Sequence, residues 1–357
     1  MSKFWERLSI IIIFAFCLLA ETAAVRGESA LHTYLHQSSS RLGAYSISVF
    51  RNGSVLYENS QGYADLTRGE KLTSRCNFFL ASITKQFTSV SLGMAQDQGR
   101  LNFHDPVSKY FYQRPFVESG MTLEHLLRHT SGLPPYRSAL KMHPRPITNE
   151  TVLQFLAQNP NLRFRPGDQF DYSNTGYVVA ASILEKVSGK SYAEILKEKI
   201  FDPLMMTGTR VSDGDPTHIP DRAIPYYYHG ALLAPVPFSA YLETYGDMGV
   251  FSSVDDLKKW TLGFQARALL SPATQTQVFS AGKFNNGNSL NYYGLGWELN
   301  QHLGQLTIEH WGLDLGTKNW VAYIPSKNIW ILALSNFEDY PAEEVRNVLL
   351  NFAISAR

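Results

Sequence analysis

The chain has 357 residues, of which 44% are hydrophobic and 18% are charged, and its formal net charge is +1. This is the composition of a globular protein with ample length for a large core, arranged as two lobes or as one domain with an insertion. The lysines and arginines are scattered along the chain, which argues against a surface for nucleic acid or for an anionic membrane.

The first 24 residues have the layout of a secretory signal peptide. Lys3 and Arg7 precede an apolar run at 8–20, and small residues follow at 22–24. The run is shorter than the roughly 20 apolar residues of a membrane-spanning helix. We therefore expect an exported protein, periplasmic or secreted, with an uncleaved N-terminal anchor as the alternative. The sequence leaves the cleavage point open.

Strand patterns occur near both ends of the chain. After a short amphipathic helix at 28–37, residues 44–51 and 54–58 read as strands joined by Asn52-Gly53, the strongest short hairpin signal. Near the C-terminus, strands are expected at 292–299, 306–311, 319–324 and 330–334, followed by a helix at 342–353. Once the leader is removed Cys76 is the only cysteine, so we expect a buried thiol and no internal disulfide.

Helix signals dominate between these strands. Helices are expected at 82–97, 122–129, 148–158, 176–187, 192–200 and 255–265, and residues 211–245 read as loop. This order predicts an α/β (α+β) fold, with an antiparallel sheet formed by both chain ends, flanked by helices, and a mostly helical lobe inserted in it. We place the domain at 28–357, with the inserted lobe at roughly 100–245, and we expect the ligand site in the cleft between the lobes.

The first candidate for chemistry is Ser82-x-x-Lys85. Ser82 opens the expected helix at 82–97, and the spacing puts its hydroxyl and the Lys85 amine on one face about a turn apart. A helix N-terminus also offers free N–H groups and a positive dipole end, which suits an oxyanion. Ser82 is therefore a candidate nucleophile activated by Lys85. The alternative is a serine that only caps the helix.

The second candidate is Tyr172-x-Asn174, on a loop before the helix at 176–187. For Tyr172 to act as a base near neutral pH, its pKa must fall by about three units, and a nearby ammonium such as Lys85 could supply much of that shift. Asn174 offers an amide that can hold Lys85 or a substrate amide. The alternative for Tyr172 is a packed loop tyrosine.

The third candidate is His310-x-Gly312, at the end of the expected strand at 306–311. A glycine there lets a substrate backbone approach the strand edge, whose N–H and C=O groups can bind it like an added strand. In a regular strand His310 and Gly312 face the same side. The alternative for His310 is a satisfied core histidine.

The order and spacing of Ser82-x-x-Lys85, Tyr172-x-Asn174 and His310-x-Gly312 resemble the three motifs of the serine β-lactamase and penicillin-binding-protein superfamily. The likeness is greatest to the branch of class C β-lactamases, D-alanyl-D-alanine carboxypeptidases and esterases. Connecting phrases at 123–133, 164–167 and 293–297 are similar too, and the resemblance covers residues 31–352. It implies a β-lactamase-like fold, with an all-helical lobe against an α/β lobe and the site between them.

The resemblance also implies roles for the motif residues. Ser82 would attack a carbonyl to give an acyl-enzyme, Lys85 and Tyr172 would shuttle the proton, and Tyr172 would activate water for deacylation. Asn174 would orient Lys85 and the substrate amide. The backbone N–H groups of Ser82 and Leu313 would form the oxyanion hole. No cofactor, metal, nucleic acid or obligate protein partner is implied, and the choice of base between Lys85 and Tyr172 stays open.

The third motif departs from the Lys-Thr-Gly of many β-lactamases, because His310 and Trp311 replace the lysine and threonine. Imidazole is mostly neutral near pH 7, so a fixed cation for a β-lactam carboxylate is lost. We therefore expect a serine hydrolase of a D-amino-acid peptide, amide or ester, a small-molecule or peptide substrate that cell-wall material could supply. The alternatives are a true class C-like β-lactamase and a catalytically silent penicillin-binding-like protein.

Two further patterns are interpreted as structural. His125 and His129 have the i, i+4 spacing of zinc-binding histidines, but no glutamate follows His125, so the H-E-x-x-H motif is absent. Several aromatic residues between the second and third motifs could line an acyl pocket, although core packing explains most of them: Tyr226 to Tyr228, Phe238, Tyr241 and Tyr245.

Overall fold

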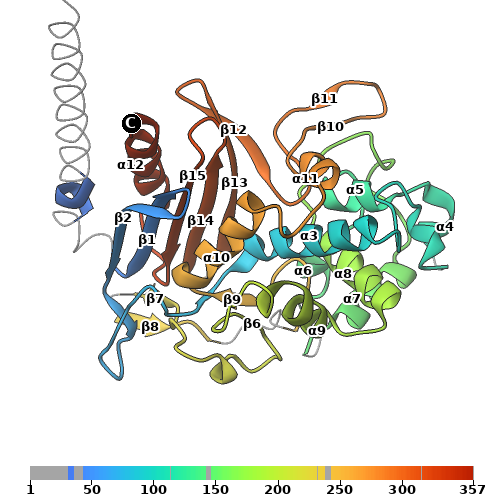
Figure 1. Cartoon of the computed structure of the whole chain (residues 1–357). Helices are drawn as coiled ribbons and strands as arrows, with labels where there is room; N and C mark the ends of the chain where they lie inside the picture. The colour runs from blue at the N-terminus through green and yellow to red at the C-terminus, as the bar shows by residue number, and fades with distance from the viewer. Residues whose placement is uncertain are drawn as a thin grey trace, which may run out of the picture.

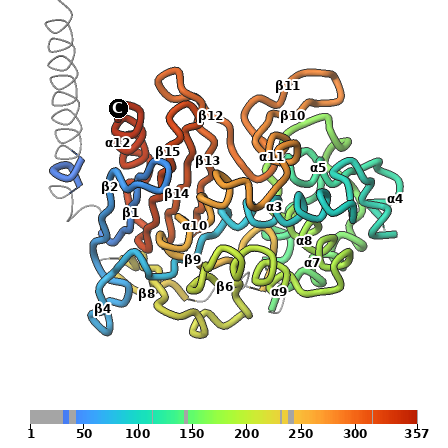
Figure 2. Tube along the Cα trace, in the orientation of Figure 1, coloured from blue at the N-terminus to red at the C-terminus, as the bar shows by residue number. Residues whose placement is uncertain are grey.

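The computed structural model describes residues 31–35, 43–112, 114–141, 146–230, 232–237, 243–314 and 316–356. Its centre is a six-stranded antiparallel sheet in the order β12-β13-β14-β15-β1-β2 (Figure 1). The strands are β1 (Tyr45–Arg51), β2 (Ser54–Gln61), β12 (Glu298–His302), β13 (Gln305–Asp314), β14 (Thr317–Ile324) and β15 (Ile329–Ser335). Figure 2 shows the blue β1 and β2 beside the red β15, which confirms that both ends of the chain build one sheet.

The predicted hairpin at Asn52-Gly53 is confirmed. Arg51 pairs with Ser54, and Asn52 and Gly53 both have positive φ angles, +50° and +80°. Two successive positive φ angles belong to the tight turn that matches the twist of paired strands.

Helices cover both faces of the sheet, so its central strands are buried on both sides. In Figure 1, α12 (Ala342–Ser355) lies on one face and α10 (Val254–Gln265) on the other. Successive residues of β15 pack into different cores: Ile331 joins the cluster under α12, whereas Trp330 and Leu332 join the larger cluster on the opposite face. This explains why β15 reads as a continuous apolar run without alternation.

Most of the remaining helices were expected, whereas the short helices at 116–119, 136–139 and 272–278 were not. These helices are α3 (Thr84–Asp97), α4 (Phe116–Ser119), α5 (Leu123–Leu127), α6 (Tyr136–Ala139), α7 (Asn149–Gln158), α8 (Asn174–Ser188), α9 (Tyr192–Leu196) and α11 (Pro272–Val278). Hydroxyl side chains fix several of the starts by accepting a backbone N–H of the first turn, at Thr122, Thr148, Ser173, Ser191, Ser253 and Ser271. Among the described residues, none of the helices combines the length and the apolar character that a bilayer crossing requires.

Short strands occur in segments for which the sequence predicted no strand. They form β3 (Tyr63–Asp65) with β4 (Glu70–Lys71), β5 (Phe78–Phe79) with β9 (Val250–Ser252) and β6 (Arg210–Val211), β7 (Tyr226–His229) with β8 (Leu232–Pro235), and β10 (Gly282–Lys283) with β11 (Ser289–Leu290). The loop expected at 211–245 therefore contains a hairpin, β7–β8. Its prolines and its tyrosine run hid the strand pattern.

Helix α3 lies at the centre of the molecule and connects the sheet to the helical part (Figure 1). Every residue from Thr84 to Gly93 is buried. The Phe87 ring stacks on Trp260 of α10 at 4.3 Å between centroids. A helix packed on all sides holds its first turn in a fixed place, and that turn follows directly on Ser82. The predicted signal peptide, residues 1–24, lies outside the described residues.

Candidate active site

Ser82 lies in a single 3-10 turn, Ala81–Ile83, between β5 and α3. The sequence suggested a helix that begins at Ser82, but the α-helix begins at Thr84. Neither the turn nor the helix has a side-chain cap, so Ser82 is not a capping residue. Ala81 has a φ of +47°, a conformation that is costly for a residue with a side chain and that occurs mainly where function requires it.

The Lys85 amine is fixed by three hydrogen bonds. Nζ donates to Ser82 Oγ at 2.9 Å, to Asn174 Oδ1 at 2.8 Å and to the backbone carbonyl of Asp247 at 3.0 Å. Lys85 is fully buried. Burial lowers the pKa of Lys85 to about 7, with the Asp247 charge raising it and the Arg137 charge lowering it. About half of the molecules therefore carry a neutral amine beside the Ser82 hydroxyl near pH 7.

Tyr172 lies beside this amine, on the loop before α8. The Lys85 Nζ is 4.9 Å from the centroid of the Tyr172 ring, and 42% of the Tyr172 surface is exposed. Desolvation nevertheless raises the pKa of Tyr172 above its usual value near 10, and a hydrogen bond with Ser82 lowers it by less. The expected lowering of the Tyr172 pKa is wrong, because desolvation dominates and raises the pKa instead.

His129 holds the loop that carries Tyr172 and Asn174. Its Nδ1 accepts a hydrogen bond from the backbone N–H of Ser173 at 3.0 Å, and its ring packs against the Tyr172 ring with 4.2 Å between centroids. Asn174 is the first residue of α8, directly after the Ser173 cap. Sequence analysis treated His129 as structural. Its place in the 123–133 phrase was the only signal of its position next to the site.

His310 is enclosed by protein atoms. The side chain is 1% exposed, Nδ1 lies 2.6 Å from the Trp311 carbonyl, and Nε2 lies 3.0 Å from the Tyr293 hydroxyl. The carbonyl can only accept, so Nδ1 carries the proton and Nε2 accepts from Tyr293. Burial lowers the pKa of His310 to about 3, and the Lys85 charge adds to the effect. Both ring nitrogens are thus occupied within the protein, as in the core-histidine alternative.

The strand edge at the third motif is open. Strand β12 pairs with β13 only as far as Glu298 opposite Glu309, so within the described part of the chain the following residues of β13 have no strand partner on that side. A Cβ added at Gly312 would lie 2.2 Å from the Leu80 carbonyl oxygen, just before the Ser82 turn. The glycine therefore permits the close contact between β13 and the Ser82 turn. The next residue, Leu313, is 54% exposed.

An ion pair that the sequence did not reveal joins the two sides of the site. Arg137 of α6 lies 3.3 Å from Asp314, at the end of β13, with side chains 32% and 19% exposed. No local pattern connects these two residues, which are distant in sequence. The pair places a positive charge close enough to influence Lys85.

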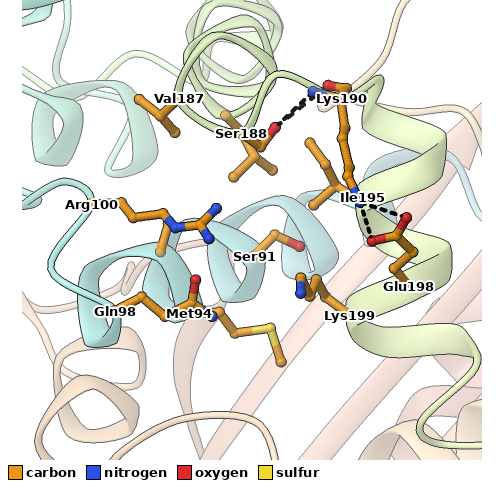
Figure 3. Close-up of a pocket in the computed structure, with 12 residues that line it drawn as sticks. Ser91, Met94, Gln98, Arg100, Val187, Ser188, Lys190, Ile195, Glu198 and Lys199 are labelled. Atoms are coloured by element: carbon orange, nitrogen blue, oxygen red, sulfur yellow. Dashed lines mark hydrogen bonds and ion pairs between the residues drawn. The ribbon is translucent and has the colours of Figure 1, made fainter.

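The cavity in Figure 3 is a different place. It has a volume of about 150 Å³, lies between α3, α8 and α9, and is lined by Ser91, Met94 and Arg100 among others. Lys190 at its rim is engaged with Glu198 and Ser188. Its lining includes none of the motif residues. Among the described residues Lys85 is the one buried lysine, and its amine contacts the Ser82 hydroxyl, so Ser82 remains the candidate site.

The remaining candidates have structural partners. His125 Nδ1 accepts from the Thr122 backbone N–H at 3.1 Å, and among the described residues no group of three or more His, Cys, Asp or Glu is placed to hold a metal. The Tyr226 hydroxyl accepts from the Leu66 N–H at 2.9 Å, and Tyr245 stacks on Tyr192. Cys76 is a buried free thiol, as expected. Phe238 and Tyr241 lie outside the described residues.

Comparisons with known proteins agree with this geometry. The Beta-lactamase family model matches residues 28–354. Penicillin-binding protein 4* of Bacillus subtilis is 31% identical over 309 residues, 82% of this chain and 68% of that protein. The teichoic acid D-alanine hydrolase of Staphylococcus aureus is 28% identical, and the match spans 64% of this chain but only 55% of that protein. The octameric penicillin-binding protein homologue from Pyrococcus abyssi superposes with a TM-score of 0.78 at 29% identity, covering 91% of this chain and 77% of that one.

Proposed function

Because the chain belongs to the Beta-lactamase family, we propose that it is an exported serine hydrolase that forms an acyl-enzyme on Ser82. One observation carries the proposal: the Lys85 Nζ lies 2.9 Å from Ser82 Oγ and is held there by Asn174 and by the Asp247 carbonyl. A hydroxyl with an adjacent base and a positioned third group is the arrangement of an activated nucleophile. The capping alternative for Ser82 lacks support, since no side-chain cap exists at this helix start.

In the proposed acylation, neutral Lys85 accepts the Ser82 proton while Oγ forms a bond to the substrate carbonyl carbon. The carbonyl oxygen becomes an oxyanion and accepts hydrogen bonds from the backbone N–H groups of Ser82 and Leu313. When the tetrahedral intermediate collapses, the amine or alcohol leaves with a proton returned from Lys85, directly or through Tyr172. Asn174 binds the substrate amide as well as Lys85.

The directions of the two pKa shifts support Lys85 as the base of acylation. A pKa of about 7 leaves a useful neutral fraction of Lys85, whereas the raised pKa of Tyr172 keeps its phenol protonated. We propose that Tyr172 passes the proton to the leaving group and, once acylation has changed the site, helps to activate the water that releases the acyl group.

The proposed substrates are D-amino-acid peptides, amides or esters. The similarity to a protein named for teichoic acid D-alanine hydrolysis supports a D-amino acyl group. His310 counts against efficient binding of a carboxylate-bearing β-lactam, since it is neutral and occupied on both nitrogens. A true β-lactamase and a silent binding protein are the other candidates. Export is proposed from residues 1–24, and N-terminal sequencing of the protein recovered outside the cytoplasm tests it.

A fluorophosphonate probe tests the nucleophile. We expect the parent protein to be labelled once, Ser82→Ala to lose the label, and Ser289→Ala, at an exposed position, to keep it. An unlabelled parent would favour the binding protein. Turnover of a D-alanyl anilide, a short aryl ester and a chromogenic cephalosporin then separates the enzymes: fast cephalosporin hydrolysis without the other two activities would refute the proposed substrate class.

A further inference from the structure

Asp247 is a buried carboxylate next to the reactive amine. The residue is fully buried, and its own backbone carbonyl is the third acceptor of the Lys85 amine, at 3.0 Å from Nζ. In the sequence, Asp247 follows Gly246, which packs against α8, and precedes β9. The roles implied by the family resemblance do not involve this side chain, and no motif of the sequence singles it out.

The carboxylate is anchored on one side only. Tyr136 of α6 donates its hydroxyl to Oδ2 at 2.8 Å and is itself within 3.1 Å of the Thr244 hydroxyl. The other oxygen, Oδ1, is buried and has no hydrogen-bond partner among the described residues. A buried carboxylate oxygen without a partner is costly, and a nearby cation is the usual compensation.

We propose that Asp247 is a positioning residue of the hydrolase: its buried carboxylate, anchored by Tyr136, is the counter-charge that keeps the Lys85 amine at Ser82 and sets the pH at which the enzyme becomes reactive. The inference rests on the proposed function, because it assigns Asp247 a part in the chemistry of Ser82. It concerns the carboxylate, whereas the backbone carbonyl of the same residue provides the hydrogen bond.

The charges around the pair fix the sign of the effect. Of the groups near Lys85, Asp247 raises the pKa of the amine, whereas Arg137 lowers it. The other ionisable groups facing Lys85 are neutral near pH 7: His129, His310, Tyr172 and Tyr177. Those facing Asp247 besides Lys85 and Arg137 are tyrosines, namely Tyr136, Tyr172 and Tyr192. Burial raises the pKa of Asp247, and Lys85 and the Tyr136 hydrogen bond oppose that rise.

The test is the pH dependence of Ser82 labelling by a fluorophosphonate in Asp247→Asn. Asparagine keeps the shape and can still accept the Tyr136 hydrogen bond, but it removes the charge. We expect the midpoint of the acid limb to fall by about one pH unit. At pH 6 the rate, relative to each variant's own plateau, would then rise from about one tenth to about one half, a fivefold gain.

Two variants and one control complete the test. Tyr136→Phe removes the anchor, which favours protonation of Asp247, so its midpoint should also fall. Arg137→Gln removes the opposing charge and should raise the midpoint. Asp256→Asn is the control, because Asp256 is also buried but binds the Gly208 and Thr209 N–H groups and the Lys259 amine, and its midpoint should stay unchanged.

The outcomes separate the inference from the proposed function. If the parent is not labelled at Ser82, the proposed function fails. If labelling is normal and Asp247→Asn only lowers the plateau while its midpoint stays at that of the parent, Asp247 is merely structural and the inference is overturned. If Asp247→Asn does not fold, the Tyr136→Phe and Arg137→Gln midpoints decide: movement in opposite directions supports the inference, and no movement overturns it.

Discussion

Gly312→Ala tests whether the contact between β13 and the Ser82 turn organises the site. The new Cβ would lie 2.2 Å from the Leu80 carbonyl oxygen and 3.2 Å from two Ile83 side-chain atoms. An ordinary contact needs about 3.4 Å, so strand and turn must separate by about 1 Å. Gly312 does not have a positive φ, and the substitution therefore acts through this separation alone.

The separation moves the Leu313 N–H away from the point where an oxyanion would form. Loss of one oxyanion donor costs about 10²–10³ in rate. We expect kcat/KM for an aryl ester to fall by at least about 100-fold, whereas the free energy of unfolding falls by only about 1–3 kcal/mol. Steady-state kinetics and thermal unfolding measure the two quantities on the same sample.

Gly208→Ala is the control. The three atoms nearest to its added Cβ are side-chain atoms of Asn77 and Asp256, at 3.3–3.4 Å, and none belongs to the Ser82 turn. We expect its kcat/KM to stay within about twofold of the parent value. A Gly312→Ala variant that folds and keeps its rate within threefold of the parent would refute the reasoning, because β13 would then have no part in aligning the site.

Three further predictions follow from the same geometry. The rate of Ser82 labelling in the parent should rise with pH and reach half its maximum near pH 7, the pKa of Lys85. Glu298→Gln should stabilise the fold by about 1–3 kcal/mol at pH 8 but leave it unchanged near pH 4, because burial and Glu309 raise the pKa of Glu298 to about 7. His129→Phe should reduce stability by about 1–3 kcal/mol and slow labelling, because the buried Ser173 N–H loses its acceptor.

The sign for Glu298 follows from proton binding. A carboxyl with a raised folded-state pKa binds its proton more tightly when folded, so the parent loses stability as the pH rises from about 4.5 to 7. Chemical denaturation of parent and variant at pH 4 and pH 8 measures the difference, with the exposed Glu70→Gln as control. Equal gains at both pH values would contradict the prediction. A labelling midpoint near pH 10 would contradict the first prediction, because Lys85 would then titrate as it does in water. A His129→Phe variant that loses stability but is labelled at the parent rate would show that anchoring of this loop does not affect the reactivity of Ser82.

The sequence predicted those structural features that depend on residues close together in the chain. The Ser82–Lys85 contact follows from their spacing at a helix start, and the Asn52-Gly53 turn follows from two residues that tolerate positive φ. Helix starts could be placed because a hydroxyl side chain caps them. The amide chemistry of Asn174 made it a candidate for holding Lys85, and the resemblance implied that the two residues meet, since nothing local joins residues so far apart.

What sequence could not predict depends on long-range burial. The Asp247 carboxylate, its Tyr136 anchor and the Arg137–Asp314 pair connect distant segments through side chains that look ordinary in their own surroundings. The rise in the Tyr172 pKa arises from desolvation, which no motif encodes. The strand β7 was hidden because a run of tyrosines followed by prolines has no clear alternation.

The pairing of β1 with β15 sets an order of events for the newly made chain. Tyr45 lies opposite Ser335, so β1 and β15 cannot pair until the ribosome has synthesised the residues between them. Helices and hairpins in the interval can form from neighbouring residues, whereas this pairing needs the closure of a very long loop. We therefore expect a polypeptide halted before β15 to keep β1 with one open edge and to aggregate through it, even when its Ser82 turn has formed.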